Sequence, residues 1–167
     1  MVQTLTFQTL NVFFLISHDR RRLLHFDVTS HPTAAWVWRQ MIEATLWGQH
    51  PRYLIHDRDR VYGADFATRA AGVGIGSIRT PIRSPRANAI AERVVRSLGQ
   101  ECLDHILPQS QGHVRPVLAG FVSYYNQDRP HRSLGLEAPV PSPRQVDGEV
   151  VSRPVLGGLH HVHDPAA

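Results

Sequence analysis

Apolar residues in the N-terminal part of the chain follow first a strand pattern and then a helical one. Two apolar, β-branched and aromatic runs, NVFFLIS (11–17) and RLLHFDVT (22–29), flank the polar segment HDRR and predict the two strands of a hairpin. The segment SHPTAAWVWRQMIEATLWG (30–48) has apolar residues at helical spacing, with Ser30 suited to cap it and Gly48 to end it. Its Trp36 and Trp38 either pack in a core or form a platform on which bases stack.

Further segments complete the predicted order of elements. RYLIHD (52–57) and IGSIRT (75–80) are typical of short strands, GADFATRAAG (63–72) of a short helix, and residues 113 to 127 of a longer one. NAIAERVVRSLGQECLDHIL (88–107) has the most regular helical pattern, and Pro108 stops it. Its apolar stripe consists of Ala91, Val94, Val95, Leu98 and Cys102. Strands and helices in this order predict a mixed α/β domain whose sheet is covered by helices.

Residues 139–167 are rich in proline and glycine and show no sustained period, which predicts a flexible tail behind a domain of residues 1–138. In this tail, HHVHD (160–164) either binds a transition metal adventitiously or is unstructured. The single cysteine, Cys102, excludes an internal disulfide and a thiolate metal cluster. Its place on an apolar helix face favours a buried thiol over a nucleophile.

Charge and the lack of long apolar runs narrow the class of protein. No run of apolar residues is long enough to cross a bilayer, and the N-terminus MVQTLTFQTL lacks the features of a signal peptide, so we expect a soluble, cytoplasmic protein without a membrane partner. The 18 basic residues outnumber 14 acidic ones, and all 18 are arginines. Arginine binds phosphate through a planar fork of donors, which makes a nucleic-acid partner a hypothesis, although a GC-rich genome also favours arginine over lysine.

Two acidic residues occupy positions where ligand sites collect in α/β proteins. Asp57 ends a predicted strand, and Glu92 opens a predicted helix. Two carboxylates brought together there would repel each other unless a cation such as Mg²⁺ lay between them. Alternatively, Glu92 pairs with Arg96 one helical turn later, and Asp57 is a turn residue. Asp59, two residues further on, competes with Asp57 for the metal-binding role.

Three segments resemble the integrase catalytic core of bacterial insertion-sequence transposases, which are relatives of retroviral integrases with an RNase H-like fold. The segments are YLIHDRDRVYG, RSPRANAIAERVVRSLGQECLDH and YYNQDRPHRSLG, and the resemblance is collinear from about Leu5 to Pro139. It implies an RNase H-like α/β fold and an activity in DNA integration or transposition. In this family two Asp and one Glu bind two Mg²⁺ or Mn²⁺ ions that catalyse polynucleotidyl transfer on DNA.

The resemblance assigns roles to individual residues. The second Asp and the Glu of the family, about 35 residues apart, match Asp57 and Glu92, which are 92 − 57 = 35 positions apart. The two residues are therefore expected to be catalytic metal ligands. Polar residues around Glu92 and in RPHRSLG are expected to contact DNA, although a structural turn explains the latter motif equally well. The expected DNA-binding residues are Arg86, Asn88, Arg93, Arg96, Arg129, His131 and Arg132.

The resemblance fails at the N-terminus. The position of the family's first Asp precedes Met1, residues 2–7 hold no acid, and neither Asp19 nor Asp27 is an obvious replacement. The family's helix-turn-helix segments are not found either. We therefore expect an N-terminally truncated catalytic core with a shortened first strand, inactive as encoded. Homo-oligomers and an intact transposase are candidate partners. The alternatives are a non-catalytic DNA-binding remnant and the product of a decayed transposase gene.

Overall fold

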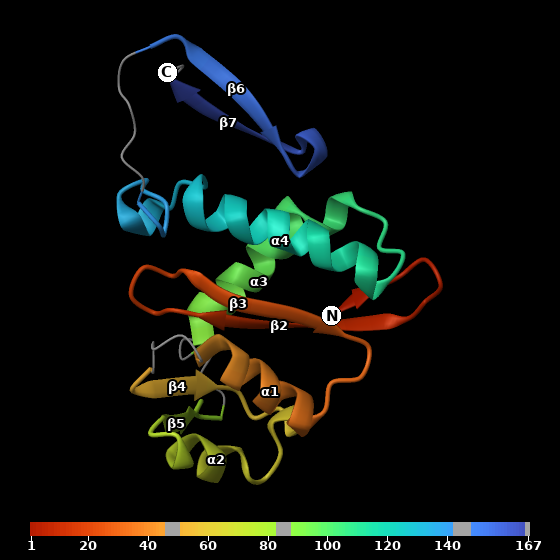
Figure 1. Cartoon of the computed structure of the whole chain (residues 1–167), viewed down its shortest axis with the longest axis vertical. Coiled ribbons are helices and arrows are strands. Elements are labelled where there is room, and N and C mark those ends of the chain that lie inside the picture. Colours follow the sequence, from red (N-terminus) through yellow and green to blue (C-terminus); the bar gives the residue numbers. More distant parts are fainter. Residues whose placement is uncertain (46–50, 83–87, 142–147, 166–167) are drawn as a thin grey trace.

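The structure is a computed structural model of the chain, and it describes residues 1–45, 51–82, 88–141 and 148–165. Its layers are visible in Figure 1, with helices on both sides of a central β-hairpin. The strands are β1 (Val2–Gln3), β2 (Thr9–Ile16), β3 (Leu23–Thr29), β4 (Tyr53–His56), β5 (Gly76–Arg79), β6 (Val150–Val155) and β7 (His160–Pro165). The α-helices are α1 (Ala34–Thr45), α2 (Phe66–Gly72), α3 (Ala89–Glu101) and α4 (Gln111–Gln127).

The described strands form three separate sheets. The first has the order β1-β2-β3 and is antiparallel throughout, the second pairs β4 with β5 in parallel, and the third is the β6-β7 hairpin. In the first sheet β3 pairs with β2 from Asn11 to Ile16, whereas β1 pairs only with Thr9 and Leu10. The predicted hairpin and the two short strands are thus confirmed, with ends shifted by one or two residues.

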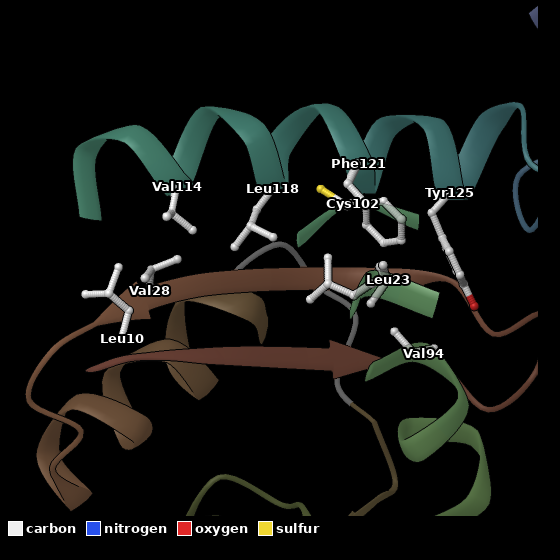
Figure 2. Packing of buried hydrophobic residues seen from close by; sticks show 10 residues of the cluster. Leu10, Leu23, Val28, Val94, Cys102, Val114, Leu118, Phe121 and Tyr125 are labelled. Atoms are coloured by element: carbon white, nitrogen blue, oxygen red, sulfur yellow. The ribbon is translucent and has the colours of Figure 1, made fainter. Parts of the chain in front are cut away.

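One face of β2 and β3 packs against α3 and α4. Figure 2 shows Val114, Leu118, Phe121 and Tyr125 pointing from α4 toward the strands. These side chains recur every three or four residues, the spacing that places them on one helical face. Strand residues and α3 residues complete the same core, namely Leu10, Leu23, Val28, Val94, Leu98 and Cys102. Cys102 is fully buried, as predicted, and burial raises the pKa of its thiol to about 11, so it remains protonated at neutral pH.

The opposite face of β2 packs against α1, β4 and α2. Leu15 joins a second core whose other buried members are Val37, Met41, Leu54, Phe66, Ala70 and Ile75. Trp36 meets Phe13 edge to face, and Trp38 meets Phe66 in the same way, so both tryptophans pack against this core. β2 is therefore covered by helices on both faces, which explains its nearly continuous apolar sequence.

Several local expectations need correction. α1 begins at Ala34, and Thr33, not Ser30, accepts a capping hydrogen bond from the Trp36 amide at 3.1 Å. α3 ends at Glu101 because Cys102 leaves helical geometry, and a 3₁₀ turn follows. Val95, expected on the apolar stripe, is 56% exposed, because its neighbour Val94 takes the place that faces the core.

Residues 139–167 also differ from expectation, because they contain the β6-β7 hairpin where an irregular tail was predicted. Arg153 of the hairpin forms an ion pair with Asp128 at 3.1 Å, and the ring of His160 stacks on Tyr124 at a centroid distance of 4.6 Å. The same imidazole donates through Nε2 to the Glu101 carbonyl at 2.7 Å. Apolar and polar residues alternate only weakly along VVSRPV, so the sequence pattern did not predict a strand there. The contacts with α3 and α4 stabilise the hairpin instead.

The first core supplies a test of the packing. Leu118→Ala is expected to lower the free energy of unfolding by about 2–5 kcal/mol, because a fully buried leucine is replaced by a cavity. Val95→Ala removes an apolar side chain of similar kind from the exposed side of α3 and should cost no more than about 0.5 kcal/mol. Urea unfolding of both variants measures the difference. Equal destabilisation by the two substitutions would contradict the assignment of the core.

Candidate functional site

Asp57 directly follows β4 in the sequence, and its neighbour His56 holds the end of that strand in place. The His56 imidazole donates through Nδ1 to the Asp57 carbonyl at 2.7 Å, and its Nε2 accepts from the Ser77 hydroxyl on β5 at 2.9 Å. This pair of bonds defines the neutral tautomer with the proton on Nδ1. The ring is buried against Tyr62 and Phe66, and Arg79 adds positive charge nearby. Burial in particular lowers the pKa of His56.

The two acidic residues of HDRD have different local roles. Asp57 accepts a hydrogen bond from the Asp59 amide through Oδ1 at 3.0 Å, the geometry of a side-chain turn. Asp59 caps the 3₁₀ turn of residues Arg60–Tyr62 by accepting from the Val61 amide at 2.9 Å. Both carboxylates are exposed. Burial, and to a smaller extent these two negative charges, raise the pKa of the Tyr62 hydroxyl. Asp57 thus forms a side-chain turn and Asp59 caps a 3₁₀ turn, and both stay candidates for the metal-binding role.

Glu92 lies in the first turn of α3 and is exposed to solvent. A carboxylate in this position interacts favourably with the partial positive charge at a helix N-terminus. The expected surface pair with Arg96 does not occur among the ion pairs of the described residues. Asn88 precedes the helix as its cap residue and makes no side-chain capping bond. Among the described residues, no ion pair engages the Glu92 carboxylate.

A cavity of about 720 Å³ separates β2 from β4 and reaches the start of α3. His56 and Ala91 line it, so Asp57 and Glu92 are each the direct neighbour of a lining residue. Within the described ranges, however, no three His, Cys, Asp or Glu side chains form a group that could hold a metal ion. The two carboxylates match part of a hard-cation donor set, but the set of three that the resemblance implies does not fit the described residues.

The other acidic candidates, Asp27 and Asp19, lie on the β2-β3 hairpin. Asp27 is buried on β3, accepts from the Val28 amide at 2.8 Å and forms an ion pair with Arg115 of α4. Arg115 also donates to the Val28 carbonyl at 3.0 Å, which ties α4 to the strand. Asp19 is exposed in the turn between β2 and β3. Asp27 is thus held in an ion pair, and Asp19 lies in an exposed turn.

Arginines from three parts of the chain line a second cavity of about 330 Å³, called here the basic pocket. Arg21 comes from the β2–β3 turn and Arg93 from α3. Arg129 and Arg132 come from the segment that follows α4 in the sequence. His131 and Ser97 also line it. Four guanidinium groups around one hollow produce a positive potential suited to phosphate. The structure therefore brings four of the predicted DNA-contacting residues together and adds Arg21, which sequence reasoning missed.

Two of these residues already have intramolecular partners. The Arg129 guanidinium binds the Glu101 carboxylate in a bidentate way, with Nε–Oε2 at 2.6 Å and Nη2–Oε1 at 2.5 Å. The hydrogen bond with Glu101 raises the pKa of Arg129. His131 is buried against Tyr125, and its Nε2 donates to the Tyr125 carbonyl at 3.3 Å. A phosphate would have to compete with Glu101 for Arg129, and Arg93 and Arg132, which are both exposed, have no such competitor among the described ion pairs.

The motif YYNQDRPHRSLG has a structural role beside any contact with DNA. The Asn126 amide group accepts from the Leu23 amide and donates to its carbonyl, both at 2.9 Å, and so continues β3 like an added strand residue. Behind it, Arg20 bonds Glu137 at 2.8 Å and the Pro139 carbonyl at 2.9 Å. These bonds hold the segment behind α4 against the β2–β3 turn. They thereby place Arg132 beside Arg21.

The remaining predicted residues are dispersed. Asn88 is half-buried and lines the first cavity, and Arg96 is exposed on α3 outside both cavities. Arg86 lies outside the described residues.

His56, which sequence reasoning missed, had a visible signal: it is a titratable residue at an inward position of an apolar strand, next to a candidate carboxylate. Arg21 had no such signal in the sequence.

Burial of His56 and His131 predicts a pH dependence of stability. Both have a pKa lowered from the ordinary value of 6.5, chiefly by burial. As the pH falls below 6.5 the unfolded chain binds protons that the folded chain does not, so stability should be constant above about pH 7 and decline toward pH 5.5. Tm measured across this range is expected to fall. In His56→Asn the decline should be smaller, although Tm at pH 7 drops through lost ring contacts; parallel curves for both proteins would contradict this role.

Comparison with known proteins identifies the fold. Residues 73–139 match the family described as Integrase core domain. The catalytic core domain of BIV integrase superimposes with a TM-score of 0.59 at 17% identity, over 77% of this chain and 81% of that one. A chain of the simian T-cell lymphotropic virus intasome in complex with PP2A regulatory subunit B56 gamma gives a TM-score of 0.58 at 11% identity, over 93% of this chain and 60% of that one.

No curated protein matches the sequence. No helix within the described ranges has the length and apolar character of a membrane span. The structural likeness, at low identity, establishes the fold, and the family match covers the part of the chain that contains Glu92 and most of the basic pocket. The chain therefore has the RNase H-like α/β fold of integrase catalytic cores, with an integrase core domain match over residues 73–139.

Proposed function

We propose that the chain is a transposase- or integrase-type protein that binds DNA, and that as a separate polypeptide it neither cuts nor joins strands. The basic pocket is the observation that carries this proposal, because Arg21, Arg93 and Arg132 supply donors where a phosphate backbone can approach. The integrase core domain match over residues 73–139 favours DNA over other polyanions. The insertion-sequence origin implied by the sequence resemblance is part of the same proposal.

Catalysis is where the proposal departs from the family. Asp57 and Glu92 are the proposed ligands for Mg²⁺ or Mn²⁺, which in this family of reactions activates the attacking hydroxyl and stabilises the charge that develops at phosphorus. A third carboxylate is required to hold two ions, and the described residues form no such group. A homo-oligomer or an intact transposase could contribute the missing ligand. Without one, the chain acts as a non-catalytic DNA-binding protein, which is the alternative that the donor set favours.

The catalytic part of this proposal can be tested with labelled oligonucleotide duplexes. We expect no nicking and no strand transfer above background in Mg²⁺ or Mn²⁺, while the same preparation shifts the duplex in a binding assay. Glu92→Gln is the matched control, because it replaces the carboxylate with a neutral group of the same shape and should leave binding within about twofold. Nicking by the unmodified chain that Glu92→Gln abolishes would contradict inactivity and show that the chain completes its own metal site.

The basic pocket gives a separate prediction for binding. Arg93→Ala is expected to weaken duplex binding by about threefold to tenfold and to reduce the slope of log K against log salt by about 0.9, because one phosphate contact and its released counterion are lost. Arg21→Ala should behave similarly. Arg39→Ala is the control, since Arg39 is an exposed arginine on α1 that lies outside the pocket. Fluorescence anisotropy at several salt concentrations measures all three. Equal losses in Arg39→Ala would mean that only net charge matters.

A further inference from the structure

One arginine of the basic pocket, Arg129, is held by three different groups. Its Nε and Nη2 donate to the two carboxylate oxygens of Glu101 at 2.6 and 2.5 Å, and Nη2 lies 3.5 Å from the Ser97 hydroxyl. The guanidinium also lies over the Tyr125 ring, 5.7 Å from its centroid. A guanidinium has five N–H donors, and within the described residues Nη1 has no hydrogen-bonding partner. Arg129 therefore lines the pocket with one edge already occupied by a carboxylate.

That carboxylate lies at an electrostatically unfavourable end of its helix. Glu101 is the last residue of α3, and the last turn of this helix contains no basic residue. The C-terminus of a helix carries partial negative charge, which disfavours a carboxylate there. Both side chains are also largely removed from water, with exposed fractions of 22% for Arg129 and 25% for Glu101. Glu101 therefore depends on Arg129 to compensate its charge, because the last turn of α3 supplies no cation.

The β6-β7 hairpin holds the backbone on both sides of this ion pair. The His160 ring donates to the Glu101 carbonyl at 2.7 Å. Arg153 pairs with Asp128, the residue before Arg129, at 3.1 Å. In Figure 1 the hairpin lies on the side of α4 that faces away from β2 and β3. Because both backbones are held, the ion pair opens most easily by side-chain rotation, in which the Glu101 carboxylate turns toward solvent.

The ion pair removes Arg129 from the positive charge of the basic pocket. A guanidinium and a carboxylate together carry no net charge, so the pair neutralises no phosphate and releases none of the counterions of DNA. A phosphodiester and a carboxylate each carry one negative charge, and exchanging one for the other at Arg129 is therefore close to balanced. Arg21, Arg93 and Arg132 line the same pocket, so their donors favour the exchange for a phosphate that is bound there.

The pair also joins the ends of two helices, and this structural role alone predicts the opposite response to its removal. If Glu101 only held Arg129 in place, losing the carboxylate would loosen the pocket and weaken binding of DNA. If Glu101 withholds Arg129 from phosphate, losing it strengthens binding. The contacts with Ser97 and Tyr125 favour the second case, because they keep the guanidinium oriented without Glu101.

We propose that Glu101 determines which phosphates the basic pocket engages: its carboxylate holds Arg129 in the free protein and yields it to a DNA phosphate that the other pocket arginines already bind. The inference rests on the proposed DNA binding, and it names a residue that sets the strength and the salt dependence of that binding. Glu101 acts through Arg129 and does not itself contact DNA, so it is a positioning residue.

Duplex binding by the full chain gives the first test. Glu101→Gln keeps the shape of the side chain and removes its charge, so binding should become about threefold to tenfold tighter. The slope of log K against log salt should steepen by about 0.9, because one more arginine neutralises a phosphate. Glu43→Gln makes the same change of net charge at an exposed position of α1 and should alter binding less than about twofold. Fluorescence anisotropy at several salt concentrations measures both variants.

Two further variants separate the contact from the net charge. Glu101→Asp keeps the charge but shortens the side chain, which breaks the bidentate contact, and should tighten binding by about twofold or more. It replaces Glu101→Gln if the latter does not melt cooperatively. Adding Arg129→Ala to Glu101→Gln should return the affinity to within about twofold of the unmodified chain, because the altered pair again carries no net charge. A double variant as tight as Glu101→Gln would mean that Glu101 does not act through Arg129, and the proposal would be wrong.

Release of the carboxylate can be followed by NMR. The side-chain carboxyl carbon signal of Glu101 is the one that is missing in Glu101→Gln. Saturating duplex should move this signal toward the position of an exposed glutamate such as Glu43, since the carboxylate leaves Arg129 for solvent. A structural ion pair would keep its signal in place. An unchanged signal in the presence of bound duplex would overturn the proposal, as would equal or weaker duplex binding by folded Glu101→Gln.

Inorganic phosphate distinguishes failure of this inference from failure of the proposed function. At each phosphate concentration Glu101→Gln should gain more Tm than the unmodified chain, equivalent to at least about threefold tighter binding, and Glu43→Gln should not. If the chain binds no duplex, the proposed function fails, and the phosphate comparison still decides whether Glu101 withholds Arg129. If duplex binds equally to Glu101→Gln and to the unmodified chain, the proposed function stands and this inference is wrong.

Discussion

Burial of β2 on both faces is the constraint on which the rest of the structure depends. Its even-numbered residues from Leu10 to Ile16 pack toward α3 and α4, and Phe13 and Leu15 pack toward α1 and β4. One short strand thus requires two layers of helices, because neither face can be left in water without exposing several large apolar side chains. The positions of α3 and β4, and hence of Glu92 and Asp57, follow from this requirement.

Polar contacts then fix the segments that the apolar cores leave undetermined. Asn126 continues the hydrogen bonding of β3, Arg115 joins Asp27 to α4, and Arg129 joins Glu101 across the ends of two helices. Charged groups that are removed from water in part require such partners. The same bonds determine which arginines have no intramolecular partner and can bind a phosphate. The basic pocket therefore depends on the contacts that hold the helices together.

The candidate site combines two regions with different physical character. The direct neighbours of Asp57 and Glu92 line the cavity of about 720 Å³ between β2 and β4, whereas four arginines line the basic pocket. α3 separates the two, so a helix of thirteen residues carries a carboxylate and an arginine in adjacent positions that serve different surfaces.

Much of the secondary structure and one half of the candidate site were determined by the sequence alone. Alternation and helical spacing are local properties, and they were sufficient to predict β2, β3, α3 and α4 and to place Asp57 at a strand end. The burial of Cys102 followed from the same helical spacing. Boundaries were less certain, as the early end of α3 and the cap at Thr33 illustrate, because they depend on single hydrogen bonds.

Tertiary structure alone decided which distant residues meet. Arg21 joins Arg129 and Arg132 only because the Arg20 and Asn126 contacts bring the hairpin turn to the segment behind α4. Asp27 meets Arg115 across 88 positions, and no local pattern predicts that pairing. The cavity of about 720 Å³ likewise arises between β2 and β4, which β3 and α1 separate in the sequence. Local periodicity shows which face of an element is buried, but the partner on that face is set by the packing of the whole chain.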